Sequence, residues 1–411
     1  MADRSTDASI GTASGTSVPA IGPLAGIRVV ELAALGAVPH AAMMLSDAGA
    51  DVLRIDRPET SDAAFDLIER GRRGNAVTRG RRSVAVDLKQ PDAASFVLEL
   101  VRRSHVFLEG FRPGVAERLG VGPDACLAVQ PSLVYGRLTG WGRDGPLAGF
   151  GGHDINYVAL SGTLAAMGPA DRPPPVPLNV VADFGGGSMQ LAFGVVAALV
   201  EATRTGRGQV VDAAMVDGAA SLATYIHSMR GAGTWVDQRE SNVLDGGAPF
   251  YGVYETSDHR FIAVGAIEPQ FYQALIEGLG FACDDLGPQL DRDSWPTTRQ
   301  LFRGRIATRT RDEWVGVFAG IDACVTPVLT MHEATEDEHL RDRGSFLSVG
   351  GVVQPAPVPR FGSSPHPTPA APVSSGVGGR AALAEWGVDE MFVEAMIDQG
   401  VVTLADDRQG R

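Results

Sequence analysis

The strongest constraint on the fold of this chain is the alternation of β-branched and helical segments through its first half. A buried-strand pattern occurs at residues 27–32, and further strand patterns occur at 51–55, 83–87, 105–109, 133–137 and 208–212. Helical patterns separate several of these strands, at residues 39–47, 91–103 and 188–203. Because parallel strands need crossover connections of this kind, the alternation predicts an α/β fold with a Rossmann-like, doubly wound parallel sheet.

The alternation fades after about Val216, and the following residues predict a smaller α+β domain. Helices are expected at 219–230, 270–279 and 298–319, and a hairpin at 250–254 and 261–265. A Pro- and Ser-rich stretch at 354–372 precedes a helical C-terminal region at 381–402. The chain is therefore divided into a disordered tail (1–22), a large α/β domain (23–215), a small α+β domain with linkers (216–345), and a part that returns to the large domain and ends in an extension (346–411).

Composition narrows the class of protein. The 411 residues are 44% hydrophobic and 20% charged, and without a run of eighteen apolar residues we expect no membrane span. The net charge of −14 argues against nucleic-acid binding. Three scattered cysteines indicate reduced thiols in a cytoplasmic protein, neither a disulfide framework nor a zinc site. The tail lacks the basic and apolar regions of a secretory signal.

Two acid/base side chains of different chemistry lie beside glycines and ahead of helical patterns. His153 belongs to Gly-Gly-His-Asp-Ile-Asn-Tyr at 151–157, and Asp183 to Val-Ala-Asp-Phe-Gly-Gly-Gly-Ser-Met at 181–189. Unpaired N–H groups at helix N-termini favour developing negative charge, so this pair suits carbanion chemistry beside a carbonyl. Taken alone, however, each has a plainer interpretation: a packed or surface histidine, and an aspartate that caps a helix.

Several common catalytic classes lack their motifs. The tripeptide Asp183-Phe-Gly185 occurs in protein kinases, but the chain has neither the Val-Ala-Ile-Lys strand nor the His-Arg-Asp loop. No Gly-x-Gly-x-x-Gly follows the first strand, so a nicotinamide or flavin site has no support. No Gly-x-Ser-x-Gly nucleophile elbow occurs either, which argues against a serine hydrolase.

Charged residues elsewhere suggest further site positions. An arginine-rich stretch favours either a solvated face or a site for phosphate groups, and it comprises Arg54, Arg57, Arg72, Arg73, Arg79, Arg81, Arg82, Arg112 and Arg118. Glu268 follows an apolar strand and precedes Pro269. It either caps the next helix or holds a catalytic imidazole in the correct tautomer.

Taken together, these motifs give the chain a family resemblance. From about Pro23 to Pro359 it resembles the α-methylacyl-CoA racemases of the CoA-transferase family III superfamily. The motifs that carry the resemblance are Leu24–Leu32, Gly49–Asp56, Val86–Lys89, Glu109–Gly114, Thr139–Gly142, Gly152–Tyr157, Ala182–Gly185 and Val264–Gln270. The tail, the residues from Glu59 to Val77 and the extension after about Gly378 lie outside the pattern.

The resemblance implies specific roles for residues. His153 and Asp183 would be the two bases, and Glu268 would be the partner of His153. CoA contacts would come from Arg57, Val86, Asp87, Leu88, Lys89, Gly110, Phe111, Arg112, Arg118, Gly152, Asp154, Ile155, Asn156 and Tyr157. The resemblance also implies an intertwined homodimer, with each active site between the large domain of one subunit and the small domain of the other.

The implied reaction interconverts (2R)- and (2S)-2-methylacyl-CoA by 1,1-proton transfer through an enolate, which N–H groups near Asp154 would stabilise. It requires no metal, nicotinamide or flavin, because CoA is part of the substrate. Two alternatives stay open: a CoA-transferase that uses Asp183 as a nucleophile, and a CoA-binding protein without catalysis. The sequence does not identify the acyl group.

Overall fold

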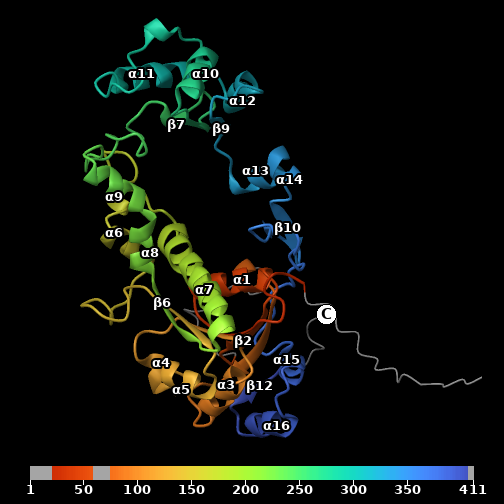
Figure 1. Cartoon of the computed structure of the whole chain (residues 1–411). Coiled ribbons are helices and arrows are strands. Elements are labelled where there is room, and N and C mark those ends of the chain that lie inside the picture. The colour runs from red at the N-terminus through yellow and green to blue at the C-terminus, as the bar shows by residue number, and fades with distance from the viewer. Residues whose placement is uncertain (1–20, 59–74, 406–411) are drawn as a thin grey trace, which may run out of the picture.

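The computed structural model describes residues 21–58 and 75–405, and its largest element is a seven-stranded sheet (Figure 1). The strands follow the order β12-β3-β2-β1-β4-β5-β6, and all except β12 run parallel. Their bounds are β1 Arg28–Leu32, β2 Asp51–Asp56, β3 Arg81–Val86, β4 Val106–Glu109, β5 Val134–Thr139, β6 Gln209–Ala214 and β12 Val402–Thr403. The predicted doubly wound parallel sheet is therefore confirmed. The tail up to residue 20, Arg72, Arg73 and most of the 59–77 segment lie outside the described residues.

Helices cover both faces of the sheet (Figure 1). Successive residues of a strand point to opposite faces, so Val29 packs with one set of helices and Val30 with the other. The first face carries α1 (Ala37–Asp47) and α7 (Met189–Thr205). The second carries α3 Ala93–Val101, α5 Pro123–Val129, α15 Gly379–Glu385 and α16 Glu390–Asp398, with the short helix α4 Val115–Arg118 close by.

The C-terminal residues complete this sheet. Val402 and Thr403 of β12 pair antiparallel with Val86 and Ala85. The backbone N–H of Ser83 also donates a hydrogen bond to the carbonyl of Val377. The side chain of Trp386 donates a hydrogen bond of 2.6 Å to Asp51. The sequence predicted a helical end to the chain, and the structure adds an edge strand after two helices.

A second unit has its own sheet and core. Strands β7 Tyr251–Glu255, β8 Phe261–Gly265 and β9 Val325–Pro327 form an antiparallel sheet. It packs with α10 Pro269–Leu279, α11 Trp295–Ile306 and α12 Arg311–Phe318, and the short 3-10 helix η5 Cys283–Asp285 lies between α10 and α11 in the sequence. The helix predicted over 298–319 is in fact two helices, α11 and α12. The second begins after Thr310, whose side chain caps it by accepting a hydrogen bond from the N–H of Glu313.

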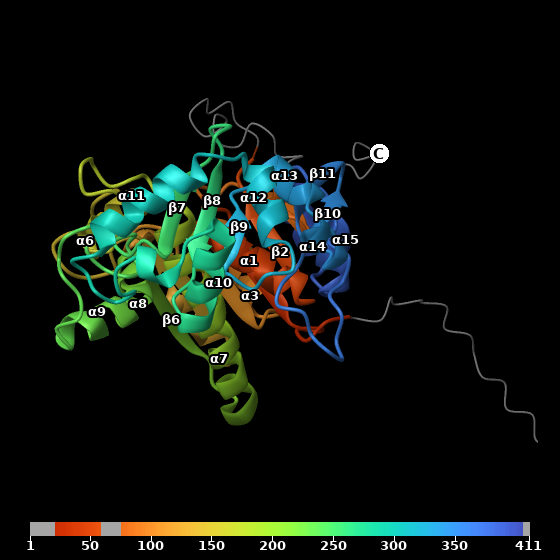
Figure 2. The ribbon, with the colours of Figure 1, turned by 90° about the horizontal axis from the view of Figure 1, so that it is seen from above.

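Figures 1 and 2 show two separate lengths of chain between these units. The first contains α8 (Met215–Leu222) and α9 (Thr224–Gly231), which together replace the single helix predicted over 219–230. The second contains α13 Met331–Glu336, α14 Glu338–Asp342, β10 Phe346–Val349 and β11 Val352–Pro355. The proposed domain boundaries at 22, 215 and 345 stay a prediction.

One helical stretch within the described residues has the length and apolar composition of a membrane span. It runs from Val180 to Thr205, and 39% of its most apolar window is buried inside the structure. Leu191 and Val195 pack against the sheet. Core helices of other proteins have the same length and composition, so this helix is weak evidence against the prediction of no membrane span.

Candidate active site

A cavity of about 620 Å³ lies at the carboxyl ends of the central strands. Its walls include the turns after β1 (Leu35–Ala37), after β4 (Gly110–Pro113) and after β5 (Gly140–Trp141). β1 and β4 are neighbours in the sheet, and the strand order reverses direction between them. Ligands of doubly wound sheets bind at such a reversal, so the fold itself marks this cavity as a binding site.

His153 lies at the N-terminus of α6 (Asp154–Leu160), as the sequence predicts, and lines the cavity. It is solvent-exposed and has extended backbone angles. Its backbone N–H donates a hydrogen bond of 3.1 Å to the side-chain oxygen of Asn156. The first turn of α6 therefore fixes the main chain that carries the imidazole.

Asp183 lines the same cavity from a different kind of element. It lies in the first turn of η4 (Val180–Ser188), a π-helix that continues directly into α7, so it is near a helix N-terminus and ahead of the predicted helix, as expected, and the structure adds the π-helix before α7. Single-turn π-helical insertions occur frequently at functional sites. A Cβ atom built at Gly36 would lie 3.9 Å from Asp183 Oδ2, which places the carboxyl group beside the turn between β1 and α1.

The surroundings of Asp183 favour its protonated form. Burial of the half-buried carboxyl and the nearby charge of Asp154 raise its pKa from 3.8 to about 6, while His153 and the side chain of Asn179 act in the opposite direction. A carboxyl group with this pKa can both accept and donate a proton near neutral pH.

Glycines allow η4 to form where it does. A Cβ at Gly218 of α8 would lie 1.8 Å from the carbonyl oxygen of Gly186, and one at Gly186 would lie 2.6 Å from the backbone nitrogen of Ala219. The run of three glycines that follows Asp183-Phe184 therefore reflects close contact between two helical segments.

Aromatic residues form the floor beside His153. The ring of Tyr157 lies edge-on to Trp141 at 4.7 Å between centroids and leaves no room for a Cβ atom at Gly140. Burial, with a smaller effect from Asp183, raises the pKa of Tyr157 to about 12. Tyr157 is therefore a neutral wall of the cavity at physiological pH.

The cavity brings together many of the predicted CoA contacts. Those that line it are Gly110, Phe111, Arg112, Gly152, Asp154, Ile155 and Tyr157. The others lie elsewhere on the large domain: Arg57, Lys89, Arg118 and Asn156 are exposed, Asp87 and Leu88 are partly buried, and the side chain of Val86 is in the core. The complete set of CoA contacts stays a prediction.

The arginine-rich stretch is largely structural. Arg79 pairs with Asp47 at 2.5 Å, Arg81 with Glu31 at 3.0 Å, and all four side chains are buried. Arg54 lies 2.9 Å from Asp56, also within the protein. Of the arginines in this stretch that the structure describes, Arg112 lines the cavity.

Glu268 lies in the other unit. It precedes the first residue of α10, is exposed, and is not among the residues that line the cavity with His153. Figure 1 places α10 and α6 in different parts of the molecule. A contact between Glu268 and His153 therefore stays a prediction, and it would require a second copy of the chain.

Sequence reasoning missed an apolar wall of the cavity. Leu35, Phe150, Val176 and Leu178 line it and are 44–67% exposed. They lie in Gly- and Pro-rich connections, where neither helical nor strand periodicity marks a buried face. Their only signal in the sequence is large apolar side chains in stretches that otherwise read as loops.

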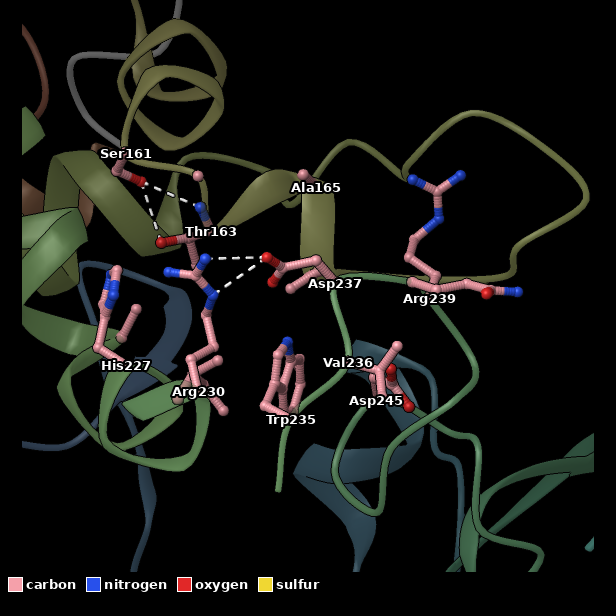
Figure 3. A pocket seen from close by; sticks show the side chains of 15 residues that line it. Ser161, Thr163, Ala165, His227, Arg230, Trp235, Val236, Asp237, Arg239 and Asp245 are labelled. Atoms are coloured by element: carbon pink, nitrogen blue, oxygen red, sulfur yellow. Dashed lines mark hydrogen bonds and ion pairs between the residues drawn. The ribbon is translucent and has the colours of Figure 1, made fainter. Parts of the chain in front are cut away.

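A second cavity, of about 310 Å³, lies between the end of α6, the 3-10 helix η3 (Leu164–Ala166), α9 and the following loop (Figure 3). Arg230 and Asp237 form an ion pair of 2.9 Å beside Trp235. This cavity does not contain the His153–Asp183 pair. Among residues 21–58 and 75–405, no group of three or more His, Cys, Asp or Glu side chains is arranged to hold a metal ion.

The pKa of Asp183 predicts a pH-dependent stability effect. Since folding raises this pKa from 3.8 to about 6, the group stabilises the fold below pH 4 and that contribution is lost as the pH rises through 6. Asp183→Asn should therefore increase the free energy of unfolding at pH 8 by about 1 kcal/mol, a value reduced for partial exposure to water, and have little effect at about pH 3, below both pKa values. Urea unfolding at both pH values tests this, with exposed Asp124→Asn as control. An equal effect at both pH values would contradict it.

Known proteins are similar to this chain in sequence and in fold. The model of the family described as CoA-transferase family III matches residues 24–376. The α-methylacyl-CoA racemases of Homo sapiens and Mus musculus are 46% and 44% identical over 343 residues, which cover 83% of this chain and 87% of each relative. A CAIB/BAIF family protein from Brucella suis, 23% identical, has the same fold with a TM-score of 0.75 over 89% of this chain and 100% of that one. Because the family model covers most of the sequence, the chain belongs to CoA-transferase family III.

Proposed function

We propose that this enzyme interconverts (2R)- and (2S)-2-methylacyl-CoA thioesters. The observation that carries the proposal is that His153 and Asp183 line one cavity at the point where the strand order reverses. Relatives named α-methylacyl-CoA racemase, 44–46% identical, support the choice of substrate.

The proposed reaction moves two protons. One base removes the α-proton, the Cα–H bond breaks, and its electron pair passes into the thioester to form an enolate. The second group, protonated beforehand, delivers a proton to the opposite face of Cα, and the enolate returns to the thioester. In the reverse direction the two groups exchange roles, so His153 and Asp183 must each act as acid and as base.

Asp183 suits this exchange of roles. A carboxyl pKa of about 6 lets Asp183 both release and take up a proton near neutral pH, as an exchange of roles requires. Asp154 begins α6, and the N–H of Asn156 already bonds to the carbonyl of His153 at 2.8 Å, so the first-turn N–H groups that would serve an enolate are those of Asp154 and Ile155. These N–H groups are the proposed donors to the enolate oxygen.

The substrate would extend from the catalytic pair along two different walls. Arg112 at the cavity can pair with phosphate groups of CoA, while Phe150, Val176 and Leu178 offer apolar surface. Binding energy from these remote contacts would position Cα between the two bases. No additional cofactor takes part in the proposed reaction.

Proton exchange tests the function directly. Each 2-methylacyl-CoA epimer is incubated with the protein in D₂O, and the α-proton is followed by NMR. Convergence of both epimers to a near-equal mixture, with loss of the α-proton signal, is the expected result. Transfer of CoA to an added carboxylic acid without exchange would favour the transferase, and neither reaction would favour a CoA-binding protein.

We further propose a homodimer. Apolar side chains of α7 remain exposed in the single chain, with Phe193 at 73% and Val200 at 56%. Glu268 lies in the small unit, apart from the cavity that it is predicted to serve. A second copy would cover the α7 face and could bring its own Glu268 to His153. The proposed location of this dimer is the cytoplasm.

The exposed face of α7 gives a test of the dimer. Phe193→Lys should shift the protein from dimer to monomer, because a buried lysine without a partner is costly at an interface. Light scattering after size-exclusion chromatography measures the mass. Val353→Lys is the control, since Val353 is 57% exposed on β11 and away from α7. A monomeric wild-type protein, or a dimer that survives Phe193→Lys, would contradict the proposed interface.

A further inference from the structure

Asp154 has an unusual environment for the first residue of a short helix. Its side chain is 3% exposed, although the neighbouring His153 and Ile155 are exposed. Oδ2 accepts hydrogen bonds from the backbone N–H groups of Ala182 at 2.7 Å and of Asp183 at 2.8 Å. Oδ1 is buried and has no hydrogen-bond partner among the residues that the structure describes.

We propose that Asp154 is a positioning residue for Asp183. Its buried carboxylate joins the start of α6 to η4, the π-helix that carries Asp183. Its negative charge favours the protonated form of the Asp183 carboxyl. The proposal rests on the racemase function and goes beyond it, since it assigns to the Asp154 side chain a role other than contact with CoA.

The geometry carries the mechanical part of this role. Two adjacent N–H groups converge on one oxygen atom, which fixes the main chain of Asp183 relative to α6. Asn156, two residues further along α6, accepts a hydrogen bond from the N–H of His153. The side chains of Asp154 and Asn156, both in the first turn of α6, thus hold the main chain at Asp183 and at His153. The separation of these two stretches of main chain is therefore set by α6.

The unpartnered oxygen supports the electrostatic part. Hydrogen bonds to both oxygens would spread and screen the negative charge, whereas Oδ1 is buried without a donor. The charge of Asp154 contributes to the raised pKa of Asp183, second to burial. Without it, a smaller fraction of Asp183 would carry a proton near neutral pH, so less of the enzyme would hold the proton that the return step delivers, and the carboxylate would be a weaker base.

Other ionisable groups near Asp183 act differently. His153 lowers the pKa of Asp183, and Tyr157 of α6 stays neutral because its own pKa is raised to about 12. From α1, His40 stacks on Phe184 at 4.5 Å between ring centroids, and burial lowers its pKa. α8 contributes Asp217 and α7 carries Glu201 and Arg204. Asp154 is the ionisable side chain that bonds directly to the Asp183 main chain in the described residues.

Asp154→Asn separates charge from geometry. Its amide oxygen can still accept both N–H bonds, so a merely structural carboxylate would be replaced with little change in the titration of Asp183. We expect instead that the Asp183 pKa falls from about 6 toward 3.8, that kcat for racemisation falls about tenfold, and that KM changes less than twofold. The limb of the pH–rate profile that belongs to Asp183 should move to lower pH.

The experiment uses the full-length protein with ¹³C-carboxyl-labelled aspartate, and Asp183→Asn identifies the Asp183 signal. Wild type and Asp154→Asn are titrated by NMR and assayed for α-proton exchange and racemisation. Asp124→Asn is the matched control, because Asp124 is also in the first turn of a seven-residue helix but is exposed. Asp124→Asn should change neither the pKa of Asp183 nor kcat for racemisation.

The outcomes separate this inference from the proposed function. An unchanged Asp183 titration in Asp154→Asn, with active wild type, overturns the role of Asp154 and leaves the racemase standing. A shifted titration, with a wild type that exchanges no α-proton, refutes the racemase and supports the role of Asp154. If Asp154→Asn does not fold, hydrogen exchange of the Ala182 and Asp183 amides in wild type decides: protected amides support the bond to Asp154, and rapid exchange overturns it.

Discussion

Replacing His153 by alanine, or Asp183 by asparagine, should lower the rate of racemisation by about 10³-fold. Each inversion needs one group to remove a proton and the other to return one, so neither group can substitute for its partner. The loss should appear mainly in kcat, since the CoA part of the substrate still binds through other residues. Racemisation is measured by separating the two epimers after incubation with either one.

Proton exchange without inversion provides a second test of the roles of His153 and Asp183. Each variant retains one base, and that base can still exchange the α-proton of the epimer whose proton faces it. His153→Ala and Asp183→Asn should therefore each catalyse deuterium incorporation into a different epimer while inverting neither. His332→Ala is the control, because His332 is exposed on α13 and outside the cavity. If either variant racemises at the wild-type rate, His153 and Asp183 are not the catalytic pair.

Gly218→Ala is expected to have the largest effect on folding among single substitutions near the site. The added Cβ would lie 1.8 Å from the carbonyl oxygen of Gly186, and backbone atoms cannot move aside as a flexible side chain can. α8 and η4 would have to separate, with a loss of about 3 kcal/mol in the free energy of unfolding. Since η4 carries Asp183, activity should fall even in the fraction that stays folded. Chemical unfolding and racemisation assays measure the two effects.

Gly316→Ala provides a matched control for that substitution. Gly316 lies inside α12 and is not at positive φ, and among the described residues an added Cβ would meet no atom within 4 Å outside its chain neighbours and the backbone of its own helix. Alanine there should increase stability by about 0.5–1 kcal/mol, because it reduces the conformational freedom of the unfolded chain. A Gly218→Ala protein as stable as wild type would show that η4 and α8 are less closely packed than described.

Local patterns in the sequence were sufficient to predict the large sheet. The strands from β1 to β5 are largely buried runs, and such runs predict parallel strands when helices separate them; the edge strand β6 is largely exposed. His153 was placed correctly at the start of a helix, since the glycines before it and the apolar pattern after it are both local signals. The position of the cavity at the carboxyl ends of the strands follows from the strand order, which reverses between β1 and β4.

Features that depend on distant partners were not predictable in this way. β12 consists of two residues, Val402 and Thr403, and only its pairing with β3 makes it a strand. The π-helical form of η4 depends on contact with Gly218, about thirty residues further along the chain. Arg79 and Arg81 resembled phosphate ligands in the sequence, but their carboxylate partners Asp47 and Glu31 bury them in the fold. The resemblance assigns Asp154 to CoA contact, which stays a prediction, whereas its hydrogen bond to the N–H of Asp183 could not be predicted from the sequence.

The C-terminal edge strand also determines when this protein can finish folding during its synthesis. A ribosome makes β3 early, but the groups that cover its outer edge come from Val377 and Val401, more than 290 residues later. Until then, the nascent chain exposes both an unpaired strand edge and the apolar surface that α15 and α16 later bury. The large domain thus completes its core only after the small unit has been translated, and in the interval the exposed edge and apolar surface make the growing polypeptide prone to aggregation.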